Sequence, residues 1–160
     1  MKYVPENLVP MFRKAAILRN EMLVSGFTDN GGAIHSAERI LDILGQRLNY
    51  PRLTHINKLR QYPDAEFSVA ALSAYERGER VLIEHVAPLR DLTRQAIGVL
   101  DRGASDRELI EFVVRHYRLV LLTVEETQRL NRVNRSRMTP DRLSEAGIKI
   151  SRRSTTLQTR

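Results

Sequence analysis

Val81-Leu82-Ile83-Glu84-His85-Val86-Ala87-Pro88 is the stretch that decides how this chain is interpreted. Three apolar residues lead into an acid and a histidine, and a proline closes the stretch. A second apolar run, Leu119-Val120-Leu121-Leu122, continues into Thr123-Val124-Glu125-Glu126. Each run is too short for an independent helix and contains β-branched residues, so each predicts a buried strand. If the two strands pair, Glu84 and His85 lie at the mouth of a small sheet.

Helical periodicity dominates the rest of the chain. Apolar residues recur at intervals of three and four, and Gly, Pro and capping residues separate the periodic segments. Pro10 is expected to start the first helix after a loosely held arm, and Pro63 to start the third. The predicted helices cover residues 10–25, 34–48, 63–75, 89–100, 105–117, 123–133 and 140–146. The fold class is therefore mainly α (α+β), a helical domain with a small two-stranded ββα-like element.

The composition is that of an ordinary globular protein. Of the 160 residues, 42% are hydrophobic and 28% are charged, which predicts one domain with a real core. No apolar run approaches the ~18–20 residues that a membrane span needs, and the N-terminus lacks the layout of a signal peptide. The absence of cysteine excludes disulfides, thiolate metal sites and a thiol nucleophile. We expect a cytoplasmic protein with no membrane partner.

The net charge of +7 is concentrated at the C-terminal end. Nine of the 26 Lys and Arg residues, but only two of the 19 acids, lie from Arg129 onward. This segment therefore carries the whole positive excess, and the rest of the chain is balanced. A local basic segment suits a polyphosphate backbone, because each contact releases counterions. The alternative is a solvated surface that keeps the protein soluble.

Residues 1–150 are predicted to form a single, mostly helical domain that contains the ββα-like element at residues 81–134. Residues 151–160 have almost no apolar side chains and predict a basic, flexible tail. A run of arginines leads into that tail with Asn131 and Asn134 among them, which is the strongest binding signal in the chain. The predicted nucleic-acid-binding residues are Arg129, Arg132, Arg135, Arg137, Arg152 and Arg153.

Glu84-His85-Val86-Ala87-Pro88 resembles the acid-His-(Ile/Val)-x-Pro signature of the HNH, or His-Me finger, nucleases. In that family the motif ends the first strand of a ββα-metal unit, and a second strand runs into a helix. The resemblance covers residues 81 to about 134, and it implies phosphodiester hydrolysis of DNA with Mg²⁺ or another divalent metal. It implies His85 as the base, Glu84 as a metal ligand and Arg118 as a phosphate or transition-state contact.

The sequence departs from the family pattern at two positions. Arg118 stands where the family has Asn, and Thr127 stands where it has the final His. Glu126 or Asn131, on the same predicted helix, is the candidate for the second metal ligand. Glu126 is also the acid that a capping box with Thr123 requires, and the sequence favours this role over metal binding. The separation between the two strands is also long, because a capped helix lies inside it.

Other interpretations stay open beside the nuclease. His85 can bond a backbone carbonyl at a strand end that Pro88 terminates, with no chemical role. The chain is then a non-catalytic accessory or regulatory protein that binds nucleic acid or another protein through its basic end. A further alternative is a structural subunit whose apolar faces are covered in a homo-oligomer.

Overall fold

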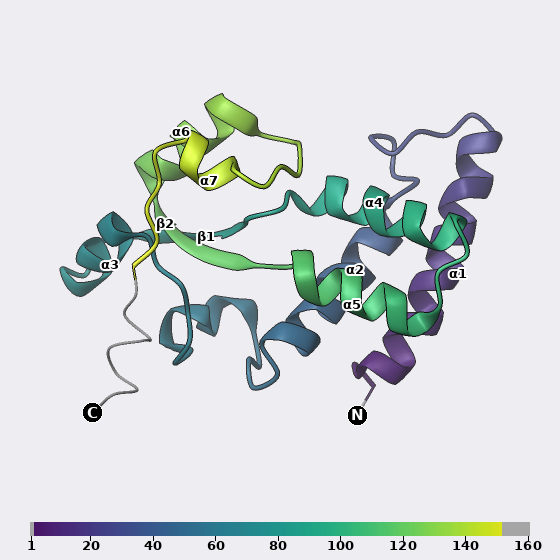
Figure 1. The fold of residues 1–160 in the computed structure, drawn as a ribbon, viewed down its shortest axis with the longest axis horizontal. Coiled ribbons are helices and arrows are strands. Elements are labelled where there is room, and N and C mark those ends of the chain that lie inside the picture. Colours follow the sequence, from purple (N-terminus) through teal and green to yellow (C-terminus); the bar gives the residue numbers. More distant parts are fainter. Residues whose placement is uncertain (1, 152–160) are drawn as a thin grey trace. The chain divides into compact units, whose positions relative to one another are not determined.

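The two apolar runs pair as antiparallel strands in the computed structural model, which describes residues 2–151 (Figure 1). Strand β1 is Val81–His85 and strand β2 is Leu119–Thr123. Within residues 2–151 all other regular elements are helices, so the prediction of a mainly α chain with a two-stranded element is confirmed. None of these helices is long and apolar enough to cross a lipid bilayer.

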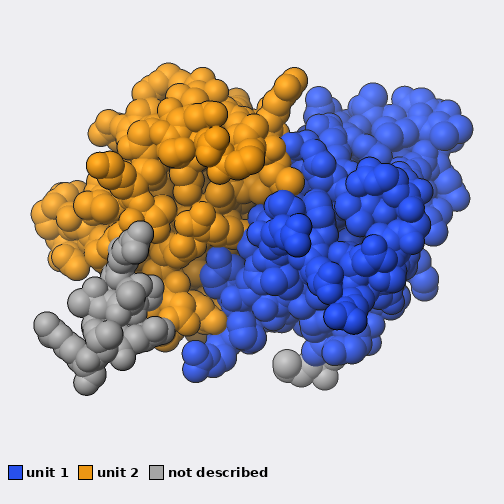
Figure 2. Space-filling view, in the orientation of Figure 1, with its two compact units in different colours: residues 1–52, 89–117 blue, residues 53–88, 118–160 orange. Residues whose placement is uncertain are grey.

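The chain groups into two compact units, each built from two separate stretches of sequence (Figure 2). We call residues 1–52 and 89–117 the helical unit, and residues 53–88 and 118–160 the sheet unit. The chain leaves the sheet unit after Pro88 and returns to it at Arg118. The long separation between the two strands is therefore a helical hairpin that belongs to the other unit.

The helical unit contains four α-helices, which are α1 (Pro5–Val24), α2 (His35–Asn49), α4 (Leu89–Asp101) and α5 (Asp106–His116). Helix α5 begins with the predicted capping box, in which Ser105 and Glu108 bond each other's backbone N–H groups. The core of the unit is aliphatic and aromatic. Its fully covered side chains include Phe12, Ile34, Leu41, Leu44, Leu92, Ile97 and Leu109.

Helix α1 starts five residues earlier than its predicted start at Pro10. Pro5 occupies the first turn, where no intrahelical N–H partner is needed, and the Val4 carbonyl accepts bonds from Asn7 and Leu8. Pro10 lies inside the helix at an exposed position, so the carbonyl that loses its partner can bond water. The prediction of a loosely held arm over residues 1–9 was wrong for residues 5–9.

Helix α2 packs closely against the end of α5. A Cβ atom at Gly45 would lie 2.2 Å from the ring of Tyr117, so only glycine allows this approach. The Tyr117 hydroxyl donates to Asp42, and burial raises the pKa of Tyr117 far above its usual range. The packing at Gly45 therefore fixes the point at which the chain leaves the helical unit.

The sheet unit contains the 3-10 helix η1 (Ile56–Gln61) and helices α3 (Val69–Glu76), α6 (Val124–Asn134) and α7 (Arg142–Glu145). The ladder runs from Val81 opposite Thr123 to His85 opposite Leu119. One apolar cluster packs α6 and α7 against this ladder. It consists of Val120, Leu122, Leu130, Leu143, Ala146 and Ile148, with Val86 and Ile150 at its margin.

Helix α3 starts at Val69, and the predicted start at Pro63 was wrong. Residues 66–68 run beside β2 instead, because Leu121 donates to the Glu66 carbonyl and Ser68 donates to the Leu121 carbonyl. Ser68 also pairs with Ile150 in an isolated bridge. Ser68 then caps α3 through its hydroxyl, which accepts from Ala71 at 2.9 Å. The small sheet is thus extended on one side by two short bridges.

Candidate nucleic-acid interface

Glu84 and His85 lie at the end of β1 nearest Pro88, as the sequence predicts. Because side chains alternate along a strand, the two residues face opposite sides of the ladder. Glu84 is opposite Val120, a member of the cluster under α6 and α7, so its side chain lies on that covered face. His85 is opposite Leu119 and is half-buried.

Arg142 is the residue that joins this strand end to the arginine segment. It is only 2% exposed, at the first position of α7. One of its Nη atoms donates to the carbonyl oxygens of His85 (2.9 Å) and Val86 (3.1 Å). Its Nε donates to the carbonyl oxygen of Asn134 at 2.9 Å, and its other Nη atom donates to the carbonyl oxygen of Arg135 at 3.5 Å. A single guanidinium therefore holds the end of β1 against the end of α6.

Glu84 lies near that guanidinium, but its carboxyl group forms no hydrogen bond with any residue in the range 2–151. Burial raises the pKa of Glu84, while the charges of Arg142 and His85 act in the opposite direction. Burial also lowers the pKa of Arg142, which nevertheless stays protonated as arginines do in proteins. This strand end therefore holds one buried cation, Arg142, beside one partly buried acid, Glu84.

The loop after α6 is held in one conformation by Asn134. The Asn134 amide donates to the Arg137 carbonyl (2.9 Å) and to the Thr139 hydroxyl (3.1 Å). Its oxygen accepts from the Arg137 backbone N–H at 2.9 Å. Together with Arg142, these bonds fix the backbone on which Arg135 and Arg137 are carried. We call Arg132, Arg135 and Arg137 the arginine loop.

The arginine loop is exposed and carries three unopposed charges. All three residues are exposed, and none forms an ion pair with another residue of the described part of the chain. Arg132 lies in the last turn of α6, where the helix dipole favours a cation. Exposed cations that form no ion pair within the described residues are suited to an anionic backbone.

Arg129 is placed differently from the other predicted binding residues. Its Nε donates to the Ala146 carbonyl at 2.6 Å, and an Nη atom bonds Glu125 at 3.2 Å. It thus connects α6 to the turn after α7, and its charge has an acidic partner. Arg152 and Arg153, predicted as binding residues, lie outside the described residues.

Arg118, predicted to contact a phosphate, forms a two-pronged ion pair with Glu66. Its Nε and Nη2 atoms bond the two carboxylate oxygens at 2.7 and 2.9 Å. Both side chains are partly exposed, at 43% and 35%. The pair ties β2 to the segment before α3, and it already compensates the charge of Arg118.

Glu126, predicted as a second metal ligand, is the buried acid of the α6 capping box. Its Oε1 accepts from the Thr123 backbone N–H at 2.9 Å and from the Ser68 hydroxyl at 2.5 Å. Thr123 pairs with Val81, three residues from Glu84 along β1, which is about 10 Å in a strand. Glu84 and this cap therefore lie at opposite ends of the ladder.

The structure does not bring the two predicted metal ligands, Glu84 and Glu126, together. Among residues 2–151 no three His, Cys, Asp or Glu side chains come together as a metal-binding group. One predicted ligand is occupied as a helix cap, and the other is a partly buried acid whose pKa is raised. Thr127, at the position of the family's final His, is buried, and its hydroxyl has no partner within the described residues. A divalent metal here stays a prediction.

Sequence reasoning did not identify Arg142 or Asn134 as organising residues. Asn134 stands among the arginines, and asparagine side chains often form hydrogen bonds with the nearby backbone. This tendency was the available signal for its role in holding the loop. Arg142 stands in a polar stretch, and nothing local to it shows that tertiary contacts bury it.

No family model, no curated protein and no solved structure matches this chain. The resemblance to HNH nucleases therefore rests on residues 81–134 alone.

Proposed function

We propose that this protein binds the phosphate backbone of nucleic acid through the arginine loop. The observation that carries the proposal is that the main chain of this loop is held by hydrogen bonds while its arginine side chains are exposed. Asn134 and Arg142 hold its main chain, while Arg132, Arg135 and Arg137 are exposed and unopposed among the described residues. A loop whose main chain is already held loses less entropy on binding than a mobile segment does.

The buried guanidinium of Arg142 adds to the positive field beneath the loop. Its hydrogen-bond partners are carbonyl oxygens, which carry no net charge. The acid whose charge acts on this guanidinium is Glu84, a partly buried carboxyl group on β1. Contacts between the exposed arginines and phosphates would position a nucleic-acid backbone without reading its sequence.

The test is a salt series of binding to a labelled DNA duplex, followed by fluorescence anisotropy. The triple variant Arg132→Ala, Arg135→Ala and Arg137→Ala should bind more weakly. Its slope of log K against log salt should be shallower by about 0.9 for each phosphate that the variant no longer neutralises. A matched RNA duplex in the same series tests the predicted preference for DNA.

The matched control removes three other exposed arginines that already have acidic partners. Arg39, Arg77 and Arg107 pair with Asp42, Glu79 and Glu111, and their replacement by Ala removes the same total charge. This control variant should keep the slope of the unmodified protein. Equal weakening in both variants would show that net charge alone binds the nucleic acid and would contradict the proposal.

Cleavage is a second candidate function, favoured by the place of His85. The carbonyl oxygens of His85 and Asn134 share one guanidinium, that of Arg142. A phosphate held at the loop would thus lie near this strand end, where His85 would act as the base. Supercoiled plasmid incubated with Mg²⁺ or Mn²⁺ should be nicked, and EDTA or His85→Ala should abolish nicking. Binding without nicking would leave a non-catalytic binding protein.

A further inference from the structure

The outer face of helix α1 is unusually apolar for a solvent-exposed helix. The side chains of Met11, Ile17, Leu18 and Val24 are exposed by 46%, 59%, 50% and 90%. Met11 and Leu18 are seven residues apart, as are Ile17 and Val24, so the four side chains form two adjacent rows of one broad stripe along the helix. The residues that α1 buries, such as Phe12 and Ala16, lie on its opposite side. This stripe, which we call the outer stripe, is independent of the arginine loop.

Two charged residues lie along the middle of the outer stripe. Lys14 and Glu21 are exposed, seven residues apart, and neither forms an ion pair within the described part of the chain. They are placed symmetrically about the midpoint between Ile17 and Leu18. The cation and the anion lie at equal distances on opposite sides of the centre. A second copy of the stripe running in the opposite direction therefore places each cation level with an anion.

We propose that two copies of this chain associate through α1, with the two helices antiparallel about a two-fold axis between Ile17 and Leu18. Lys14 of each copy then lies level with Glu21 of the other. At the axis Ile17 meets Ile17 of the other copy, and Leu18 meets Leu18. Farther out, Met11 lies level with Val24 of the other copy, and Pro10 lies level with Ser25. Such an interface is isologous, since every contact occurs twice. Helix α1 is 20 residues long, which gives about 30 Å of contact length.

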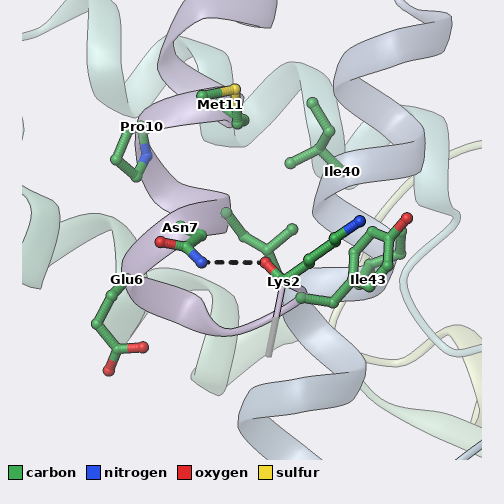
Figure 3. Close-up of a pocket in the computed structure, with 9 residues that line it drawn as sticks. Lys2, Glu6, Asn7, Pro10, Met11, Ile40 and Ile43 are labelled. Carbon is green, nitrogen blue, oxygen red and sulfur yellow. Dashed lines mark hydrogen bonds between the residues drawn. The ribbon is translucent and has the colours of Figure 1, made fainter.

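A pocket beside the N-terminal half of α1 provides a second point of contact. It has a volume of about 410 Å³ and is lined chiefly by Leu8, Pro10 and Met11 of α1 and by Ile40 and Ile43 of α2 (Figure 3). In the antiparallel pair, the pocket of one copy lies level with the turn that follows Val24 in the other copy. Phe27 is found there, with 56% of its surface exposed. A cavity of about 150 Å³ is large enough for benzene, so a phenyl ring fits the pocket.

The turn after α1 is of a type that places Phe27 on the Met22 side of the helix. Gly26 has a φ of +94° and donates to the Leu23 carbonyl, while Phe27 donates to the Met22 carbonyl. This is the Schellman arrangement, which commonly packs the residue after the glycine over the residue at Met22. Met22 and Met11 lie on the same side of α1, because eleven residues make about three turns. The two-fold axis keeps that side of both helices together, so each Phe27 faces the pocket of the other copy.

Charge reversal provides the test, with self-association measured by analytical ultracentrifugation over a concentration series. Lys14→Glu places two acids level with each other on both sides of the axis, and Glu21→Lys places two lysines there. Each variant alone should self-associate about ten-fold or more weakly than the unmodified protein. An equimolar mixture of the two variants should recover the association, because every reversed residue then meets its opposite.

The recovery in the mixture separates a disrupted interface from a disrupted fold, and circular dichroism of each variant checks the helix content. Phe27→Ala should weaken the association with no change in the charge pattern. The matched charge controls are Lys58→Glu and Glu76→Lys, exposed residues of the sheet unit, and these should leave association unchanged. The proposal is overturned if the unmodified protein stays monomeric throughout the series, or if the mixture associates no better than its components.

Discussion

Asp29 in the helical unit and Arg142 in the sheet unit are both buried charged side chains, and the two units stabilise them in different ways. In the helical unit Asp29 is 8% exposed and receives two bonds from Arg19 (2.8 and 2.9 Å) and one from Arg94 (2.9 Å). In the sheet unit Arg142 is 2% exposed and donates only to backbone carbonyl oxygens. The charge of Asp29 is therefore balanced by the opposite charges of its arginine partners. The charge of Arg142 is instead stabilised by the dipoles of carbonyl groups.

This difference explains why the two buried charges have different consequences. The hydrogen bonds from Arg19 and Arg94 hold the pKa of Asp29 at about 2, so that site responds to acid. Arg142 does not titrate in any ordinary pH range. The helical unit thus contains a pH-dependent ion pair, and the sheet unit contains a permanent cation that also shapes a loop.

Replacing Arg142 should have the largest effect. Arg142→Met keeps the length of the side chain but leaves the carbonyls of His85, Val86 and Asn134 without their buried donor. The free energy of unfolding should fall by about 3 kcal/mol or more, measured by urea denaturation. Arg132→Met, at an exposed position without a partner among the described residues, is the control and should change stability by less than about 0.5 kcal/mol. Similar destabilisation in both variants would contradict the anchoring role of Arg142.

Replacing Asp29 should have an intermediate effect that depends on pH. Asp29→Asn keeps the shape but removes the charge that Arg19 and Arg94 share, so stability at neutral pH should fall by about 2 kcal/mol. Because the pKa of Asp29 is lowered in the folded state, its contribution is complete above the unfolded value near 3.8. It is lost as the pH falls toward about 2, so the unmodified protein and the variant should converge there.

Asp106 supplies the matched control for this prediction. It pairs with Arg13 at 2.6 Å, but both side chains are substantially exposed, at 62% and 36%. Asp106→Asn should therefore cost less than about 1 kcal/mol. If the Asp29 variant showed the same stability difference at pH 3 as at pH 7, the assigned pKa shift would be wrong.

Replacing Glu84 should have the smallest effect on stability, and it should raise stability where the other two replacements lower it. Because burial raises the pKa of Glu84 in the folded state, the ionised carboxylate at neutral pH costs stability. The contribution of its protonated form is present below the ordinary pKa and is lost as the pH rises above it. Glu84→Gln should thus stabilise the protein at pH 7 by less than about 1 kcal/mol and leave its stability at pH 4 nearly unchanged. Thermal melting at the two pH values measures this, and a clear decrease in stability at pH 7 would mean that Glu84 acts as a required anion.

Local signals in the sequence were sufficient to predict much of the fold. The apolar runs at Val81 and Leu119 predicted the strands, and the capping boxes at Ser105 and Thr123 predicted two helix starts. The starts of α1 and α3 were missed because each has a competing proline. Pro5 and Pro10 are equally able to open a helix from sequence alone, and the segment after Pro63 follows β2 only through its tertiary hydrogen bonds.

The candidate site was less predictable, because the role of an arginine depends on its neighbours in space. Arg118 and Arg132 look alike in the sequence, yet the first pairs with Glu66, which is 52 residues away, and the second is exposed. Arg142 likewise forms its buried hydrogen bonds with carbonyl oxygens of two distant elements, β1 and α6. The resemblance around His85 stays a prediction.

The interleaving of the two units has a consequence for the order of folding. Strands β1 and β2 can meet only after the chain from Leu89 to Tyr117 has brought its ends together, and closing a long loop costs conformational entropy. Helices α4 and α5 form from local contacts, and as a hairpin they return the chain close to its starting point. We therefore expect the α4–α5 hairpin to form first and to lower the entropic barrier for the sheet, so that the arginine loop, anchored on that sheet through Arg142, is completed last.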